Sequence, residues 1–377
     1  MSTQYFSITP QDAWFFRDGR PYNHAESNQA DVESVFPPSA RTLTGAVRAA
    51  LARANGWDGQ PRGWPAKVTE AFGSGPNDLG KLQFSGPFLL RDGQPLWPIP
   101  RHLLGRSEGG GWIPKAFLRP GTALIETDQG KRNLPKITLP PGEKRDGPKP
   151  AEVAWITTVG LSQILVGHVP SPDAVLQPTQ LWQFESRIGL KRDDQTHKVG
   201  EGDLHSPSYI RLCRGVALGV GLTGVPGEMN SLPALFPFGG ESRLAQSEPW
   251  VGGPLPKAPE AGTFKPNAGG RVEFVVILLT PGRFADPTLF FSDARLISAC
   301  VGKPVPIGGW DSLNNEPLPL EPFHPAGSVW FCEAPTDAFH NRICVQHGRW
   351  IGDDTAHGFG QIVIGHWPST PDLKNET

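Results

Sequence analysis

The sequence predicts an α+β fold with few helices, many short strands and long loops. Of the 377 residues, 45 are glycine and 41 are proline, and both residue types interrupt helices and mark turns. Hydrophobic residues make up 38% of the chain, which is enough for two domains with cores. The first hundred residues follow the order strand, helix, strand, strand, which is the beginning of a ferredoxin-like unit.

Charge and cysteine content narrow the possible functions. The net charge is −2, so any contact with nucleic acid must be a local basic patch. The four cysteines form no C-x-x-C pair and have no histidine cluster beside them, which predicts reduced thiols and no metal or other cofactor. The N-terminus lacks a charged segment followed by an apolar one, and the longest apolar run is VVILL. We therefore expect a soluble, cytoplasmic protein with no membrane segment.

The first strand, expected over residues 5–16, ends at a basic turn with the motif FFRDGRP. Asp-Gly is a turn dipeptide, and a proline cannot continue a strand ladder. This places Arg17 and Arg20 at the strand end. A helix whose first amides point outward follows in the chain, and such an arrangement can bind an anion.

That helix is expected over residues 39–55, with Ser39 as a good N-cap after two prolines. Its apolar side chains share one face: Leu43, Ala46, Val47, Ala50, Leu51 and Ala54. Arg41, Gly45 and Arg48 lie on the opposite face, where a glycine between two arginines lets a phosphate approach the helix backbone. The alternative is an ordinary solvated helix face.

The stretches FFRDGRP and FPPSARTLTGAVRAAL resemble the N-terminal signature of a known family. They are similar to those of RAMP-superfamily proteins of type III CRISPR effectors, specifically the third subunit of the type III-B Cmr complex. Later motifs in the chain test this resemblance.

Residues 82–90 and 96–99 are the next expected strands, on either side of an Asp-Gly turn. Over residues 101–150 periodicity is lost, glycine and proline are frequent, and Lys and Arg outnumber Asp and Glu two to one. We interpret this segment as a basic insertion and not as a domain. It is either a solvated surface loop or a basic arm that lies on a polyanion. A short helix is expected over residues 155–166.

A second basic motif reads FESRIGLKRD and continues into HKVGEGDLH. It resembles a second signature of the same Cmr subunit, apart from His205, where the family has an aromatic residue. Arg187 and Lys191 share a strand face, and with Arg192 they can hold a phosphodiester backbone. The alternative is an exposed edge across which Glu185 forms a pair.

The string GVGLTG at residues 219–224 matches the dinucleotide fingerprint G-x-G-x-x-G. Pro226 and Gly227 follow it and prevent the helix that would bind a pyrophosphate. We predict a strand here, in which the glycines let a neighbour pack closely.

Buried strands are expected over residues 272–279 and 328–332, and the chain ends in a glycine-rich loop and strand, HGFGQIVIG. This loop resembles the loop found across RAMP proteins, and the motifs GGWD and PAGSVWF resemble the Cmr subunit. The resemblance implies RNA contacts by three loop residues: His357, Gly358 and Gly360.

The resemblance implies a pair of ferredoxin-like (RRM-like) domains with long Gly/Pro-rich insertions, which we place at residues 1–205 and 206–377. It implies a non-catalytic subunit that holds the 5′ handle of the crRNA. This subunit would dock to the large polymerase-like subunit and the backbone subunit, with target RNA as an indirect partner. The expected RNA-binding residues are Arg17, Arg20, Ser39, Arg41, Gly45, Arg48, Arg187, Lys191, Arg192, His357, Gly358 and Gly360.

Two other functions stay open. Some RAMP proteins cleave repeat RNA with a histidine or tyrosine as general acid or base, and Tyr22, His24 and His357 stand near the expected RNA-binding motifs. A subunit that binds only proteins is the second alternative, which the basic helix face disfavours.

Overall fold

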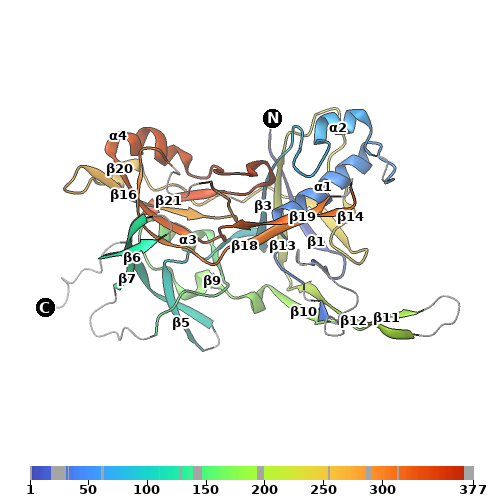
Figure 1. Cartoon of the computed structure of the whole chain (residues 1–377), viewed down its shortest axis with the longest axis horizontal. Coiled ribbons are helices and arrows are strands. Elements are labelled where there is room, and N and C mark those ends of the chain that lie inside the picture. The colour runs from blue at the N-terminus through green and yellow to red at the C-terminus, as the bar shows by residue number, and fades with distance from the viewer. Residues whose placement is uncertain are drawn as a thin grey trace. The chain divides into compact units, whose positions relative to one another are not determined.

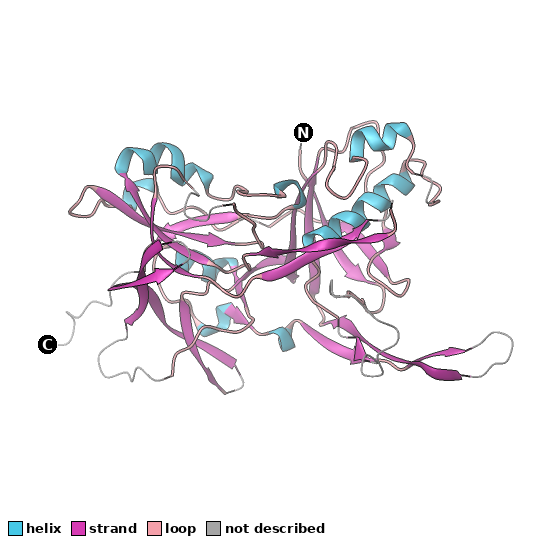
Figure 2. Cartoon of the chain, in the orientation of Figure 1, coloured by secondary structure: helices cyan, strands magenta, loops and turns pink. Residues whose placement is uncertain are grey.

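A computed structural model describes most of the chain (Figure 1). The described residues are 2–17, 31–32, 34–60, 63–109, 111–127, 130–138, 147–192, 199–253, 255–285, 291–311 and 314–368. Antiparallel strands dominate and helices are few (Figure 2). The predicted α+β class is confirmed.

The chain divides into two compact units, each built from three segments. Unit 1 consists of Met1–Gly93, Thr179–Gly252 and Pro306–Glu321, and unit 2 consists of Gln94–Pro178, Gly253–Val305 and Pro322–Thr377. The domain boundary expected at residue 205 stays a prediction.

The main sheet of unit 1 is antiparallel and has the strand order β14-β15-β1-β13-β3. Its strands are β1 (Gln4–Pro10), β3 (Gln83–Arg91), β13 (Val216–Thr223), β14 (Leu235–Pro237) and β15 (Leu244–Pro249). Two helices, α1 (Ala40–Ala54) and α2 (Ala66–Phe72), belong to the same unit. The first strand was expected to reach residue 16, but β1 ends at Pro10.

Helix α1 forms where the sequence predicts it. The Ser39 hydroxyl accepts a hydrogen bond from the Thr42 amide at 3.2 Å and caps the first turn. Leu43, Val47 and Leu51 are buried, as expected for the apolar face. Burial of this face holds the helix in the unit.

The glycine-rich string at 219–224 is a packed strand, as predicted. A Cβ added at Gly221 would lie 2.2 Å from Ser85 Oγ, and one added at Gly219 would lie 2.9 Å from the Trp250 ring. Leu218 and Val220 are fully buried. The glycines therefore serve close packing between strands.

Unit 1 also contains a ribbon and a two-stranded sheet. In the ribbon, β12 (Val199–Leu212) pairs antiparallel with β10 (Trp182–Ser186) and β11 (Gly189–Arg192), and parallel with β2 (Asp31–Val32). The hairpin of β11 and β12 extends away from the main sheet of this unit (Figure 1). Strands β18 (Val305–Asp311) and β19 (Glu316–Phe323) form the two-stranded sheet.

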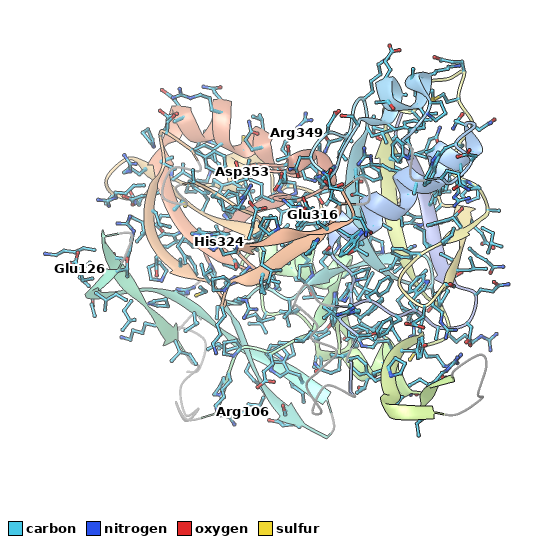
Figure 3. All side chains as sticks on the ribbon, turned by 45° about the vertical axis from the view of Figure 1, so that its right-hand side comes forward. Arg106, Glu126, Glu316, His324, Arg349 and Asp353 are labelled. Atoms are coloured by element: carbon cyan, nitrogen blue, oxygen red, sulfur yellow. The ribbon has the colours of Figure 1, made fainter. Side chains whose placement is uncertain are left out.

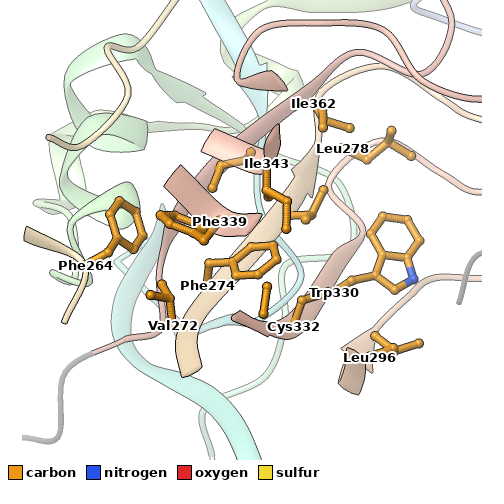
Figure 4. Close-up of a cluster of buried hydrophobic side chains, with 13 residues drawn as sticks. Phe264, Val272, Phe274, Leu278, Leu296, Trp330, Cys332, Phe339, Ile343 and Ile362 are labelled. Atoms are coloured by element: carbon orange, nitrogen blue, oxygen red, sulfur yellow. The ribbon is translucent and has the colours of Figure 1, made fainter. Parts of the chain in front are cut away.

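The main sheet of unit 2 is antiparallel and has the order β17-β20-β16-β21. Its strands are β16 (Arg271–Leu278), β17 (Arg295–Cys300), β20 (Val329–Pro335) and β21 (Ile362–His366). They confirm the expected buried strands. Figure 4 shows their core, in which Phe274, Trp330 and Phe339 pack with short apolar side chains.

Short helical segments connect the strands of unit 2. They are α4 (Thr336–Ala338), the π-turn Phe339–Ile343 and the 3-10 turns Ala261–Thr263, Cys344–Gln346 and Thr355–His357. A further group comprises β4 (Gln94–Pro98), β8 (Trp155–Thr157), α3 (Thr158–Leu165) and β9 (Val175–Leu176), with 3-10 turns at Pro172–Ala174 and Pro178–Gln180. The helix expected over 155–166 is therefore a short strand followed by α3.

Residues 101–150 are not the surface loop that was expected as one alternative, whereas their interpretation as a basic insertion stays a prediction. They contain an antiparallel sheet of β5 (Leu103–Glu108), β6 (Gly111–Thr127) and β7 (Gly130–Thr138). The strand register shifts near Gly105 and again after Pro120. Such bulges break the alternation of apolar and polar residues by which strands are recognised.

Candidate nucleic-acid interface

The outer face of α1 is partly accessible. Gly45 is exposed, and a Cβ added to it would meet no atom within 4 Å. Arg41 lies beside it but its side chain is only 7% exposed, and its guanidinium pairs with Glu321 at 2.7 Å. The helix backbone at Gly45 is therefore open to a ligand, while Arg41 is already paired with a carboxylate.

Arg48 does not face solvent, so the prediction that it lies on the exposed basic face is wrong. Its side chain is buried, and it donates to the carbonyl oxygens of Phe72, Gly75 and Asp78 at 2.8–2.9 Å. Burial lowers the pKa of Arg48 to about 10. The guanidinium ties α1 to the end of α2 and the turn that follows, a contact that helical periodicity cannot reveal.

Arg187 lies in a cluster of charged side chains at the base of the β10–β12 ribbon, which we call the ribbon-base cluster. Its members are Asp12, Glu185, Arg187, Tyr209, Arg211 and Arg243. Arg187 pairs with Glu185 at 2.6 Å and with Asp12 at 2.9 Å. The pairing of Glu185, which the sequence left as the alternative, is the arrangement that the structure has.

Arg211 completes the cluster by contacting the same two carboxylates, Glu185 and Asp12. Hydrogen bonds from Arg187 and then Arg211 lower the pKa of Asp12, and those from Arg211 and then Arg187 lower the pKa of Glu185. Both carboxylates therefore stay ionised. A phosphate that approached Arg187 or Arg211 would have to compete with these two carboxylates for the guanidinium groups.

Tyr209 is the buried centre of the ribbon-base cluster. The guanidinium carbon of Arg243 lies 4.2 Å from the Tyr209 ring centroid and that of Arg187 lies 5.0 Å from it. The ring also packs on Phe15, with centroids 5.6 Å apart. The cluster thus fastens the ribbon to the segment that follows β1, with cation–π contacts and ion pairs acting together.

The remaining basic candidates of unit 1 divide into described and undescribed side chains. Arg17 is exposed at the end of the segment after β1. Lys191 and Arg192 belong to β11, where the structure describes the backbone alone. Arg20 lies outside the described residues, as do Tyr22 and His24. Their RNA contacts stay predictions.

The C-terminal glycine loop is shaped by contacts inside unit 2. Gly360 has φ +78°, and a Cβ on it would lie 2.0 Å from the Ile351 carbonyl oxygen. Thr280 Oγ1 donates to the Gly358 carbonyl at 2.8 Å and accepts from the Gln361 amide at 2.9 Å. Close packing within the unit therefore explains why Gly360 must be a glycine.

His357 and the acidic residues before it also face inward or pair locally. His357 is 5% exposed. Asp353, which Figure 3 labels, and Asp354 both pair with Arg283 at 3.4 Å. These ion pairs hold the turn that leads into the loop.

Sequence reasoning missed Asp12, Arg211 and Arg243. Each lies far along the chain from Arg187, and no local spacing links them. The one available signal was Glu185, two residues before Arg187, because residues i and i+2 of a strand share a face.

The described part of the chain contains neither a metal-binding cluster nor a disulfide bond. Among those residues, no three His, Cys, Asp or Glu side chains gather at ligand distance. The four cysteines are free, and burial raises the pKa of both Cys300 and Cys332 to about 12. Within the same residues, no helix combines the length and apolar character that crossing a bilayer requires.

Fold and site together define an α+β protein of two sheet units. Arg41, Arg48, Arg187 and Arg211 have partners within it, and the α1 backbone at Gly45 is accessible. The sequence matches the family described as CRISPR-associated protein (Cas_Cmr3) over residues 6–367, and the chain belongs to this family. The resemblance to the third subunit of the type III-B Cmr complex is thereby confirmed.

Two solved structures contain similar chains. One is titled as the cryo-EM structure of the Type III-B Cmr-beta bound to cognate target RNA and AMPPnP, state 1; its chain has a TM-score of 0.47 and 16% identity, over 87% of this chain and 86% of that chain. The other, of Type III-B Cmr-beta bound to cognate target RNA, has a TM-score of 0.46 with the same identity of 16% and the same coverage of 87% and 86%. No curated protein matches the sequence.

Proposed function

We propose that this chain is a non-catalytic crRNA-binding subunit of a cytoplasmic type III-B effector. It holds the 5′ handle of the crRNA and docks to the large polymerase-like subunit and the backbone subunit, and it meets target RNA only through the crRNA. Membership of the Cmr3 family over residues 6–367 carries this proposal. The RNA contact and the two named docking partners go beyond what membership states.

The geometry supports an RNA path over the α1 face of unit 1. Gly45 leaves the helix backbone open to a phosphate, and Arg17 is exposed. Arg48 contributes by holding α1 in place and not by touching RNA, because its donors are used on carbonyl oxygens.

The burial of His357 supports a non-catalytic role. A general acid or base must reach the attacking hydroxyl or the leaving oxygen, directly or through one water. A histidine that is 5% exposed does not offer that access to an RNA strand on the surface.

We also propose that each main sheet is a ferredoxin-like module. Along the chain, the strands of unit 1 are β1, β3, β13 and β15, and in space they lie in the order fourth, first, third, second. The strands of unit 2, β16, β17, β20 and β21, have the same order. The ferredoxin-like fold has one helix after its first strand and another before its fourth. Unit 1 has a helix at the first of these positions, α1, and unit 2 has a helix at the second, α4.

The test is purification with and without the other subunits of the effector. We expect intact crRNA to co-purify with the complex and to cross-link to this chain at its handle. Cleaved repeat RNA that depends on His24 or His357 would support the endoribonuclease alternative. Assembly with the other subunits but no cross-link to RNA would support the protein-only scaffold.

A further inference from the structure

Arg101 of unit 2 is a half-buried arginine whose charge is not compensated within the described part of the chain. It follows β4, and its amide donates to the Gly327 carbonyl at 2.8 Å. Its Nε is buried without a hydrogen-bond partner. Among the described residues, no carboxylate lies within ion-pair distance of its guanidinium and no acceptor bonds to it.

Other arginines of low exposure have such partners. Arg48 donates to three carbonyl oxygens and Arg41 pairs with Glu321. Arg119 is the closest match to Arg101, because burial lowers the pKa of both, yet the Arg119 guanidinium donates to the Pro368 carbonyl. Arg101 therefore carries the cost of desolvation without the usual compensation.

A glycine makes room for the Arg101 side chain. A Cβ added at Gly302 would lie 2.5 Å from the guanidinium carbon and 2.8 Å from one terminal nitrogen. The guanidinium thus rests against the Gly302 backbone. Lys303, the next residue in the chain, is exposed and carries a second positive charge.

We propose that Arg101, seated against Gly302, binds a backbone phosphodiester of the RNA. The planar guanidinium offers paired donors that match two phosphate oxygens, and Lys303, the neighbour of Gly302 in the chain, adds a point charge. A bound phosphate would supply the missing counter-charge. This inference rests on the proposed RNA-binding function and assigns it a contact in unit 2, at a residue outside the expected RNA-binding set.

Three variants separate ligand binding from a structural role. Arg101→Met keeps the stem and removes the charge, Arg101→Lys keeps the charge and removes the fork, and Arg119→Met is the matched control. Melting temperature and affinity for the crRNA that co-purifies with the wild-type protein are measured for each, the latter over a range of salt concentrations. Inorganic phosphate serves as a competitor, to distinguish a simple anion from the RNA backbone.

We expect Arg101→Met to melt at or above the wild-type temperature, because an uncompensated half-buried charge is removed. Its RNA affinity should fall about tenfold, and the slope of log affinity against log salt should decrease by about 0.7. Arg101→Lys should keep the salt slope and lose part of the affinity. Arg119→Met should show the reverse of Arg101→Met, with a lower melting temperature and unchanged affinity.

Gly302→Ala gives a second, independent variant. The new Cβ meets the far end of a flexible side chain, so the Arg101 head can move aside and the fold is kept. RNA affinity should fall although no charge is lost.

Four results would overturn the inference. The first is a lower melting temperature for Arg101→Met with unchanged RNA affinity, and the second is equal affinity in all variants. Loss of assembly with the other subunits at unchanged RNA affinity would identify a partner's carboxylate as the anion. Absence of RNA binding by the wild-type protein and its complex would overturn both this inference and the proposed function, whereas the first three results leave the proposed function intact.

Discussion

The C-terminal half of α1 and the ribbon-base cluster hold their arginines in opposite ways. On α1, Arg48 is buried, donates to three neutral carbonyl oxygens and lies over the Trp64 ring. At the ribbon base, Arg187 and Arg211 are 36% and 43% exposed and share two carboxylates. A buried guanidinium that satisfies carbonyls holds a fold together, whereas an exposed ion pair contributes little to stability and can be exchanged for another anion.

The largest effect is expected at Arg48. Replacement by alanine leaves three carbonyl oxygens, at the end of α2 and in the turn that follows, without their donor. We expect the free energy of unfolding to fall by about 3–5 kcal/mol. Denaturant titration measures this loss. Arg53→Ala, at an exposed position of the same helix, is the matched control and should change stability by less than about 0.5 kcal/mol. Equal effects of the two variants would mean that the carbonyl contacts of Arg48 do not stabilise the unit.

The next largest effect is a loss of folding stability at acidic pH. His102 is fully buried between Phe117 and Phe331, and burial lowers its pKa from 6.5 to about 3. Between these two values the unfolded chain binds the proton and the folded chain does not, so stability falls as the pH falls below 6.5. The loss is about 1.4 kcal/mol per pH unit at most, or about 3 kcal/mol near pH 4.3.

Denaturation at a series of pH values tests this expectation. His102→Phe should flatten the pH dependence in this window, while the exposed His168→Gln should leave it as in the wild-type protein. An unchanged slope in His102→Phe would show that the acid sensitivity has another origin. Because His102 lies in unit 2, spectroscopic probes of that unit should report the change.

A smaller effect is expected at the ribbon base. A double-mutant cycle with Glu185→Gln and Arg211→Gln should give a coupling energy of about 0.5–1 kcal/mol that decreases with salt. The lowered pKa values of Glu185 and Asp12 mean that this contribution is present at neutral pH and is lost as the pH falls through them. A coupling as large as that expected at Arg48 would contradict the contrast between the two regions.

The smallest effect on stability is expected at Gly45. Alanine meets open space there, so Gly45→Ala should stabilise α1 by about 0.5–1 kcal/mol. RNA affinity should decrease, because the methyl group blocks the approach to the helix backbone. A variant that is more stable and binds RNA equally well would show that the α1 face is an ordinary solvated surface.

Local patterns in the sequence predicted much of the fold. The N-cap at Ser39, the apolar stripe through Leu43 and Val47 and the buried strand β16 follow from periods of 3.6 and 2 residues, which act over short distances along the chain. The same reasoning recognised GVGLTG as a strand, because Pro226 excludes the helix that a nucleotide site needs. The family followed from short motifs spread along the chain.

Only the tertiary structure decided what each arginine does. The sequence around Arg48 and Arg101 does not indicate what either side chain contacts. Arg48 donates to three carbonyl oxygens of residues 24 to 30 positions further on. The Arg101 guanidinium lies against Gly302, about two hundred positions away. The sheet in 101–150 was missed for a related reason, since its bulges break the periodic pattern. The sequence by itself determined helix α1, the buried strands β16 and β20 and the family, because these depend on neighbours along the chain. Whether a charged side chain has a partner depends on which distant segments the fold brings close to it.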